Sequence, residues 1–146
     1  MYNSERGILG EKFVREILER SGYKVSKRML GKTGYDLEVE KNGKILTVEI
    51  KTTGNLKGGI PDMHNTEFSE FEGKYYFVAD RLFIVRLDEN FNPLRVDILT
   101  KEDIDKYADS HKTVTRIRTT KLDTDIKNGK IGKTINVKVM PPVLEL

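Results

Sequence analysis

The sequence contains no cysteine, only two histidines and no apolar run of membrane-spanning length. The absence of cysteine excludes disulfides and thiolate metal sites. His64 and His111 do not have the spacing of a zinc site or of a catalytic triad. Because the chain also lacks a signal-like apolar start, we expect a cytoplasmic protein without membrane contact.

A phosphate-binding loop of the Walker type is missing as well. Gly54 to Gly59 is rich in glycine, but no Lys-Ser/Thr pair and no helix start follow it. We therefore expect no nucleotide cofactor. The longer polar segment from Gly54 to Asn65 suits substrate contact, and His64 within it is either a surface residue or an aid to proton transfer.

The excess of positive charge lies at the end of the chain, because acidic residues slightly outnumber Lys and Arg over residues 1–109. The net charge is +3 over 146 residues, and residues 110–146 hold eight Lys and Arg against three acidic residues. This length fits one compact domain. We expect a core domain over residues 1–109 and a basic extension of the same domain over residues 110–146.

Two segments of the basic extension alternate between apolar and polar residues. Residues 113–119 and 133–139 therefore predict strands, and Asn128-Gly129 between them is a turn signal, so we expect an added C-terminal β-ribbon. Its Arg116, Arg118 and Lys121 suit contacts with DNA phosphates. The alternative is that these cations protect an edge strand from aggregation.

A hairpin is predicted around Asn42-Gly43, which favours a two-residue turn. Residues whose numbers sum to 85 then lie opposite one another, so Asp36 faces Glu49 across the two strands. The other face of the hairpin is apolar and suits packing against a helix. Its expected members are Tyr35, Leu37, Val39, Leu46, Val48 and Ile50.

The polar face of this hairpin carries the candidate chemistry. A solvated face is the ordinary explanation for charged strand residues, but such a face gains from opposing Lys to Glu, whereas two opposed acids repel. Mg²⁺ removes that repulsion and accepts one or two carboxylates as ligands. Lys51 lies on the same face, where it can orient water or stabilise charge that develops on a phosphate.

An amphipathic helix precedes the hairpin. Gly22 is its expected end, and Glu11 falls on the edge of the apolar stripe, where it either reaches the polar site or extends into water. The stripe consists of Ile8, Leu9, Phe13, Val14, Ile17 and Leu18.

Gly34-Tyr35-Asp36 and Glu49-Ile50-Lys51 resemble the signature of the PD-(D/E)XK nuclease superfamily, with Tyr35 where a proline often stands. The resemblance spans about residues 5–55. As in Holliday-junction resolvases and restriction-endonuclease-like domains, a helix opening at Gly10-Glu11, a strand over residues 24–28 and a Gly-rich segment precede the aspartate.

This resemblance implies an α/β fold of the restriction-endonuclease type, with a mixed central β-sheet flanked by helices. It further implies a Mg²⁺- or Mn²⁺-dependent deoxyribonuclease, acting on DNA as a homodimer. The alternative is a non-catalytic module that docks DNA or a partner enzyme. The expected metal ligands are Asp36, Glu49 and the Ile50 carbonyl, the other catalytic residues are Lys51 and Glu11, and further DNA contacts come from Lys32, Thr52 and Thr53.

Overall fold

A computed structural model describes residues 3–54, 67–110, 115–117, 119–139 and 143–146. Its centre is a six-stranded sheet of order β1-β2-β3-β6-β7-β10, in which β3 and β6 are parallel and the other neighbours are antiparallel. The predicted fold class, a mixed central sheet flanked by helices, is confirmed. The strands of this sheet are β1 (Lys24–Lys27), β2 (Leu37–Lys41), β3 (Lys44–Thr53), β6 (Arg81–Leu87), β7 (Pro93–Thr100) and β10 (Lys133–Asn136).

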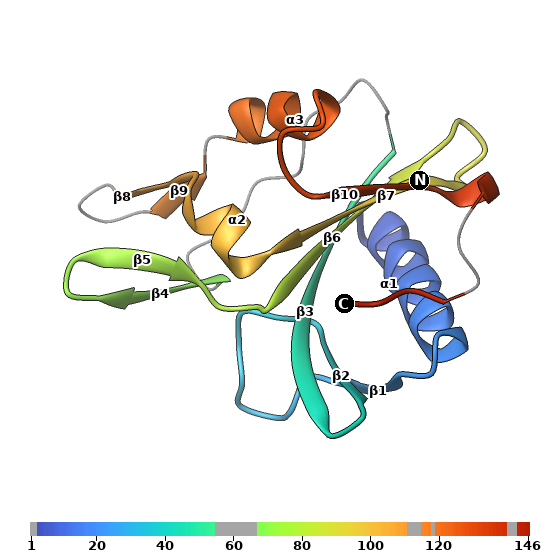
Figure 1. Ribbon diagram of the computed structural model, residues 1–146, viewed down its shortest axis with the longest axis horizontal. Coiled ribbons are helices and arrows are strands. Elements are labelled where there is room, and N and C mark those ends of the chain that lie inside the picture. The colour runs from blue at the N-terminus through green and yellow to red at the C-terminus, as the bar shows by residue number, and fades with distance from the viewer. Residues whose placement is uncertain (1–2, 55–66, 111–114, 118, 140–142) are drawn as a thin grey trace.

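Helices and small ribbons cover both faces of the sheet (Figure 1). The α1 helix lies on one face, and α2, α3 and the β4–β5 hairpin lie on the other. The helices are α1 (Asn3–Arg20), α2 (Lys101–Asp105), α3 (Thr119–Lys127) and the 3₁₀ turn η2 (Val137–Val139). The remaining strands form two ribbons, β4 (Phe68–Phe71) with β5 (Lys74–Phe77) and β8 (Ala108–Ser110) with β9 (Thr115–Ile117).

The β2–β3 hairpin has the predicted register. Leu37 pairs with Val48 and Lys41 with Lys44, so the residue numbers of each pair sum to 85. Asn42 and Gly43 have φ values of 53° and 79°, as a type I′ turn requires. The apolar face packs with α1 as expected.

Tyr35 is the exception on that apolar face, and its assignment there was wrong. The regular alternation begins only at Leu37, the first residue of β2. The buried Tyr35 ring belongs to the cluster on the other side of the sheet, and its hydroxyl donates a hydrogen bond to Glu38 Oε1 at 2.7 Å.

The α1 helix ends where the sequence predicts but starts earlier. Gly22 (φ 93°) terminates it in a Schellman motif, with Tyr23 N–H donating to Leu18 O and Gly22 N–H to Glu19 O. The expected start at Gly10 was wrong, because α1 already begins at Asn3. Gly10 serves packing instead, since a Cβ there would lie 1.9 Å from Thr52 Oγ1 on β3.

The C-terminal region adds β-structure but in a different pairing. The predicted ribbon of residues 113–119 with 133–139 was wrong, because β9 pairs with β8 and β10 pairs with β7, while η2 follows β10. Between them lies α3, which buries Leu122 and Ile126 four residues apart, at helical spacing. Asn128 and Gly129 (φ 70°) follow α3 in a second Schellman motif rather than forming a hairpin turn.

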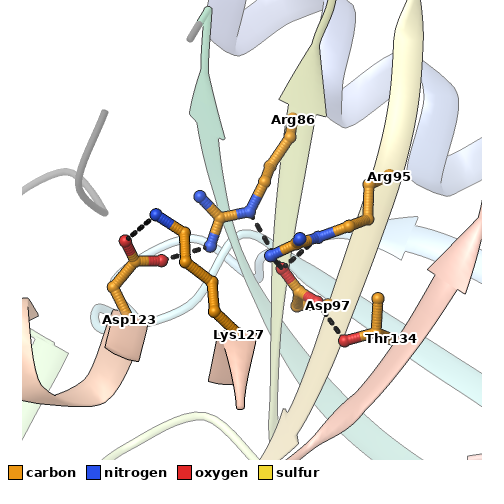
Figure 2. A network of polar contacts seen from close by, with 6 residues as sticks. All are labelled: Arg86, Arg95, Asp97, Asp123, Lys127 and Thr134. Carbon is orange, nitrogen blue, oxygen red and sulfur yellow. Dashed lines mark hydrogen bonds and ion pairs between the residues drawn. The ribbon is translucent and has the colours of Figure 1, made fainter. Parts of the chain in front are cut away.

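A buried ionic cluster joins α3 to the sheet (Figure 2). Arg86, whose side chain is fully buried, donates from Nε to Asp97 Oδ2 at 2.9 Å and from Nη2 to Asp123 Oδ1 at 2.6 Å. Burial by itself raises the pKa of Asp123, but hydrogen bonds from Lys127 and Arg86 bring this pKa below its ordinary value. The Arg86 cluster consists of Arg86, Arg95, Asp97, Asp123, Lys127 and Thr134.

Candidate active site

Asp36 lies immediately before β2 and is held by its own peptide groups. Its N–H donates to Val48 O at 2.8 Å, and its O accepts from Arg28 N at 3.2 Å. The side chain is turned toward β3, where Oδ2 accepts a hydrogen bond from Ile50 N at 2.8 Å. The carboxylate therefore lies beside the Glu49–Ile50 peptide, as the hairpin register predicts.

Glu49 lies next to Asp36 in an environment that disfavours its charge. Its side chain is buried, with 7% of the residue exposed. Burial, followed by the negative charges of Asp36 and Glu67 and a hydrogen bond with Asp36, raises the pKa of Glu49 to about 9, against the opposing effect of Lys51. Without a cation, Glu49 is thus protonated at neutral pH and donates a hydrogen bond to Asp36.

Lys51 extends from the same face of β3 as Glu49, because residues two apart on a strand point the same way. Its Nζ lies 3.9 Å from Glu49 Oε1 and 2.5 Å from Glu67 Oε1. The ammonium group is mostly buried between these two carboxylates. The structure thus places Asp36 beside Glu49 and Lys51 next to Glu49, while the catalytic roles of these residues stay a prediction.

Glu67 is the member of this group that the sequence did not reveal. It is buried, it precedes β4, and its carbonyl accepts a hydrogen bond from Val78 N at 2.9 Å. That bond fixes Glu67 at the base of the β4–β5 hairpin, from which the side chain reaches Lys51. No spacing rule connects residue 67 with residue 51, so only the tertiary structure identifies it.

Glu11 occupies a different place from these residues. The α1 helix packs on the sheet face that carries Val48 and Ile50, whereas Glu49 and Lys51 point to the opposite face. Glu11 is half-buried, and no hydrogen bond or ion pair connects it to the acidic pair within the described part of the chain. Its auxiliary role stays a prediction.

The acidic pair fits a divalent cation. Among the described residues, no group of three or more His, Cys, Asp or Glu side chains is arranged around a common metal position. Mg²⁺ does not require such a group, since it commonly takes one or two carboxylates and completes its shell with water and substrate oxygens. Asp36 and Glu49 supply two carboxylates whose mutual repulsion a cation would relieve.

The predicted DNA contacts fall into three groups. Lys32 and Lys121 are exposed, the first before Asp36 and the second on α3 rather than on a ribbon. Thr52 and Thr53 face the interior, and Thr52 Oγ1 is covered by α1 at Gly10. The third group, the Arg116 side chain and Arg118, lies outside what the structure describes. The two histidines, His64 and His111, also lie outside the described residues.

The described helices include none that is both long enough and apolar enough to cross a membrane. No protein family and no curated protein matches the sequence. Among solved structures, the chain is similar to one titled "The structure of a bacterial homing endonuclease: I-Ssp6803I", with a TM-score of 0.48 and 15% identity. That alignment covers 88% of this chain and 91% of the other.

Proposed function

We propose that this protein is a Mg²⁺- or Mn²⁺-dependent DNA endonuclease of the PD-(D/E)XK type, which hydrolyses phosphodiester bonds. The observation that carries the proposal is the buried Glu49 beside the half-buried Asp36, with Lys51 next to Glu49. Placing a buried acid beside a second acid is unfavourable for folding, and a ligand that needs both would explain the arrangement. A divalent cation is such a ligand.

Each residue of the site has a separate role in the proposed hydrolysis. Asp36 and Glu49 would hold the metal through their carboxylates, with the Ile50 carbonyl as a third ligand. The bound metal supplies Lewis-acid activation of water and of the phosphate. Lys51 orients the attacking water or stabilises the charge that develops on the phosphate oxygens as the bond from phosphorus to the leaving oxygen breaks.

Glu67 is a positioning residue in this scheme. Its carboxylate contacts Lys51 Nζ at 2.5 Å and so holds the ammonium group next to Glu49. A lysine has a flexible stem with several rotatable bonds, and a fixed partner reduces the number of positions that Nζ samples. Replacing Glu67 by Gln should therefore lower kcat more than it changes KM for DNA.

Action on DNA as a homodimer in the cytoplasm belongs to the same proposal. The exposed Lys32 and Lys121 support contacts with the phosphate backbone. Light scattering after size-exclusion chromatography, with and without DNA, tests the dimer. A monomer in both conditions would contradict that part alone.

The decisive experiment is cleavage of labelled branched, single-stranded and linear duplex DNA with Mg²⁺ or Mn²⁺. We expect Asp36→Asn and Lys51→Ala each to abolish cutting while circular dichroism stays unchanged. Glu40→Gln, which alters an exposed acid on the neighbouring strand β2, is the matched control and should cut normally. Glu11→Gln in the same assay tests the auxiliary role. Full activity of both site variants would overturn the proposal.

The competing function is a docking module that binds DNA without cutting it. Calorimetric titration with Mg²⁺ and Mn²⁺ separates the two functions independently of the substrate chosen. The nuclease should bind metal in a manner that depends on Asp36 and Glu49. Metal-independent DNA binding with no product on any of the three DNA forms would favour the docking module.

A further inference from the structure

The loop between β1 and β2, residues 28–36, presents two apolar side chains to solvent. Leu30 is fully exposed and Met29 is 59% exposed. They are not in a disordered tail: Lys32 N donates to Met29 O at 3.1 Å, and Gly31 has φ 84°. This is the geometry of a type II turn with Leu30 and Gly31 at its corner positions. An ordered turn thus holds Leu30 outward.

The base of this loop is tied to the candidate active site. Arg28 N donates to Asp36 O at 3.2 Å, and Arg28 Nη1 donates to Tyr35 O at 3.4 Å. Tyr35 is buried and anchors the end of the loop next to Asp36. The apolar tip therefore lies on a loop whose base is hydrogen-bonded to the backbone of Asp36, the residue whose carboxylate lies beside Glu49. Figure 1 shows this loop and the β4–β5 hairpin projecting to the same side of β3.

Positive charge surrounds the apolar tip. Residues 24–35 contain four basic residues and no acidic one. The side chains of Lys27, Arg28 and Lys32 are all exposed. The net charge of this short segment is thus opposite to that of the neighbouring acidic site. The cations complement the phosphates of DNA, and the apolar tip complements the faces of bases that are accessible.

We propose that Met29 and Leu30 form a wedge that inserts between bases of DNA whose stacking is already interrupted, while Lys27, Arg28 and Lys32 contact the adjacent phosphates. Apolar side chains inserted between base steps unstack and kink the duplex, at a cost that is least where stacking is already broken. The wedge would direct the nuclease to branch points, nicks or mismatches. This inference rests on the proposed DNA endonuclease function and deepens it by naming the substrate class.

The test measures binding without cutting. A Lys51→Ala background keeps the DNA intact, and 2-aminopurine at a branch point reports unstacking by a rise in fluorescence. In this background we expect Met29→Ser/Leu30→Ser to lose the fluorescence rise and to weaken binding of branched DNA about tenfold, with less than about a twofold change for linear duplex. Ile45→Ser, which alters an apolar residue 61% exposed near the β2–β3 turn, is the matched control and should behave like its parent.

The cations of the loop give a second, independent readout. Lys27→Ala/Lys32→Ala should weaken binding of branched and linear DNA alike and reduce the dependence of log K on log salt concentration by about two, because phosphate contacts carry no base information. If both loop variants bind every DNA form as their parent does, the wedge is overturned. Binding of the parent to vesicles of anionic phospholipid in preference to DNA would overturn it in favour of a membrane contact.

These outcomes are distinct from failure of the nuclease. If the wild-type protein cuts no DNA but the loop variants lose the 2-aminopurine signal, the wedge stands and the endonuclease proposal fails. If cleavage depends on Asp36 and Lys51 while Met29→Ser/Leu30→Ser, tested with Lys51 intact, cuts branched DNA at the wild-type rate, the wedge fails and the endonuclease stands.

Discussion

Two buried groups of charged side chains lie on the same face of the sheet, and they differ in how their charges are balanced. In the Arg86 cluster, Asp97 contacts Arg86 and Arg95, and Asp123 contacts Arg86 and Lys127. Each carboxylate there has two cations. At the candidate active site the described residues show the reverse proportion, with the carboxyl groups of Asp36, Glu49 and Glu67 near one lysine.

This difference is the reason that we assign a structural role to the Arg86 cluster and propose a binding role for the acids near Lys51. A buried ion pair is tolerated when both partners are present and hydrogen-bonded, and the two carboxylates of the Arg86 cluster are paired with cations of their own chain. Among the described residues, Lys51 is the cation that the acids of the candidate active site share, and burial, followed by the charges of Asp36 and Glu67, raises the pKa of Glu49 to about 9. A cation bound between Asp36 and Glu49 would let both carboxylates carry their charge, which is the physical argument for the metal in the proposed function.

Removing the central cation of the balanced cluster should have the largest effect on stability. Arg86→Met leaves Asp97 and Asp123 buried with fewer partners, so we expect the free energy of unfolding to fall by about 3–5 kcal/mol. Urea denaturation of the metal-free protein measures it. Arg81→Met, on the same strand but partly exposed, is the control and should cost less than about 1 kcal/mol. A loss at Arg86 no larger than at Arg81 would contradict the structural role of the cluster.

Removing an acid from the group near Lys51 should instead increase the stability of the metal-free protein. Glu49→Gln keeps the shape of the protonated side chain and can still donate to Asp36, but it no longer has to take up a proton on folding. We expect the metal-free protein to gain about 1–3 kcal/mol at pH 7 and to lose its stabilisation by Mg²⁺. Thermal unfolding with EDTA and with Mg²⁺ tests both effects, beside Glu40→Gln, which should change neither. A destabilised Glu49→Gln would contradict the repulsion.

The placement of Asp36 beside Glu49 on the β2–β3 hairpin could be predicted from the sequence. Asn42-Gly43 fixes a two-residue turn, the turn fixes the register, and the register brings Asp36 to Glu49. All these steps are local along the chain, so pattern and turn chemistry suffice. Glu67 escaped the same reasoning because its contact with Lys51 depends on how the β4–β5 hairpin returns to the sheet.

The C-terminal region shows why local patterns fail elsewhere. Asn-Gly serves a hairpin turn and a helix end equally well, and at Asn128-Gly129 the burial of Leu122 and Ile126 decides for the helix. Arg86 likewise lies in a run of apolar strand residues, and that run alone does not predict that its guanidinium group is buried. Its partners Asp97 and Asp123 come from β7 and α3.

The stability of the metal-free protein should also depend on pH through Glu49. Glu49 has a pKa of about 9 in the folded protein against 4.5 for the ordinary carboxyl, so between these values the folded state holds a proton that the unfolded state has released. Stability of the metal-free protein should therefore decrease as pH rises from 5 to 8, by at most about 1.4 kcal/mol per pH unit from this group. Urea denaturation at several pH values, wild type against Glu49→Gln, isolates the slope. An identical pH dependence in both proteins would contradict it.

The smallest effect should come from the periphery of the balanced cluster. Lys127 Nζ lies 2.9 Å from Asp123 Oδ2, but its side chain is 39% exposed. Lys127→Met should therefore cost only about 0.5 kcal/mol, and the difference from wild type should vanish in 1 M salt, whereas the cost of Arg86→Met should persist because buried pairs are screened less. Denaturation in low and high salt measures both. A salt-independent loss of stability in Lys127→Met as large as that in Arg86→Met would contradict this expectation. The contribution of the cluster would then depend on the number of its cations rather than on the burial of each one.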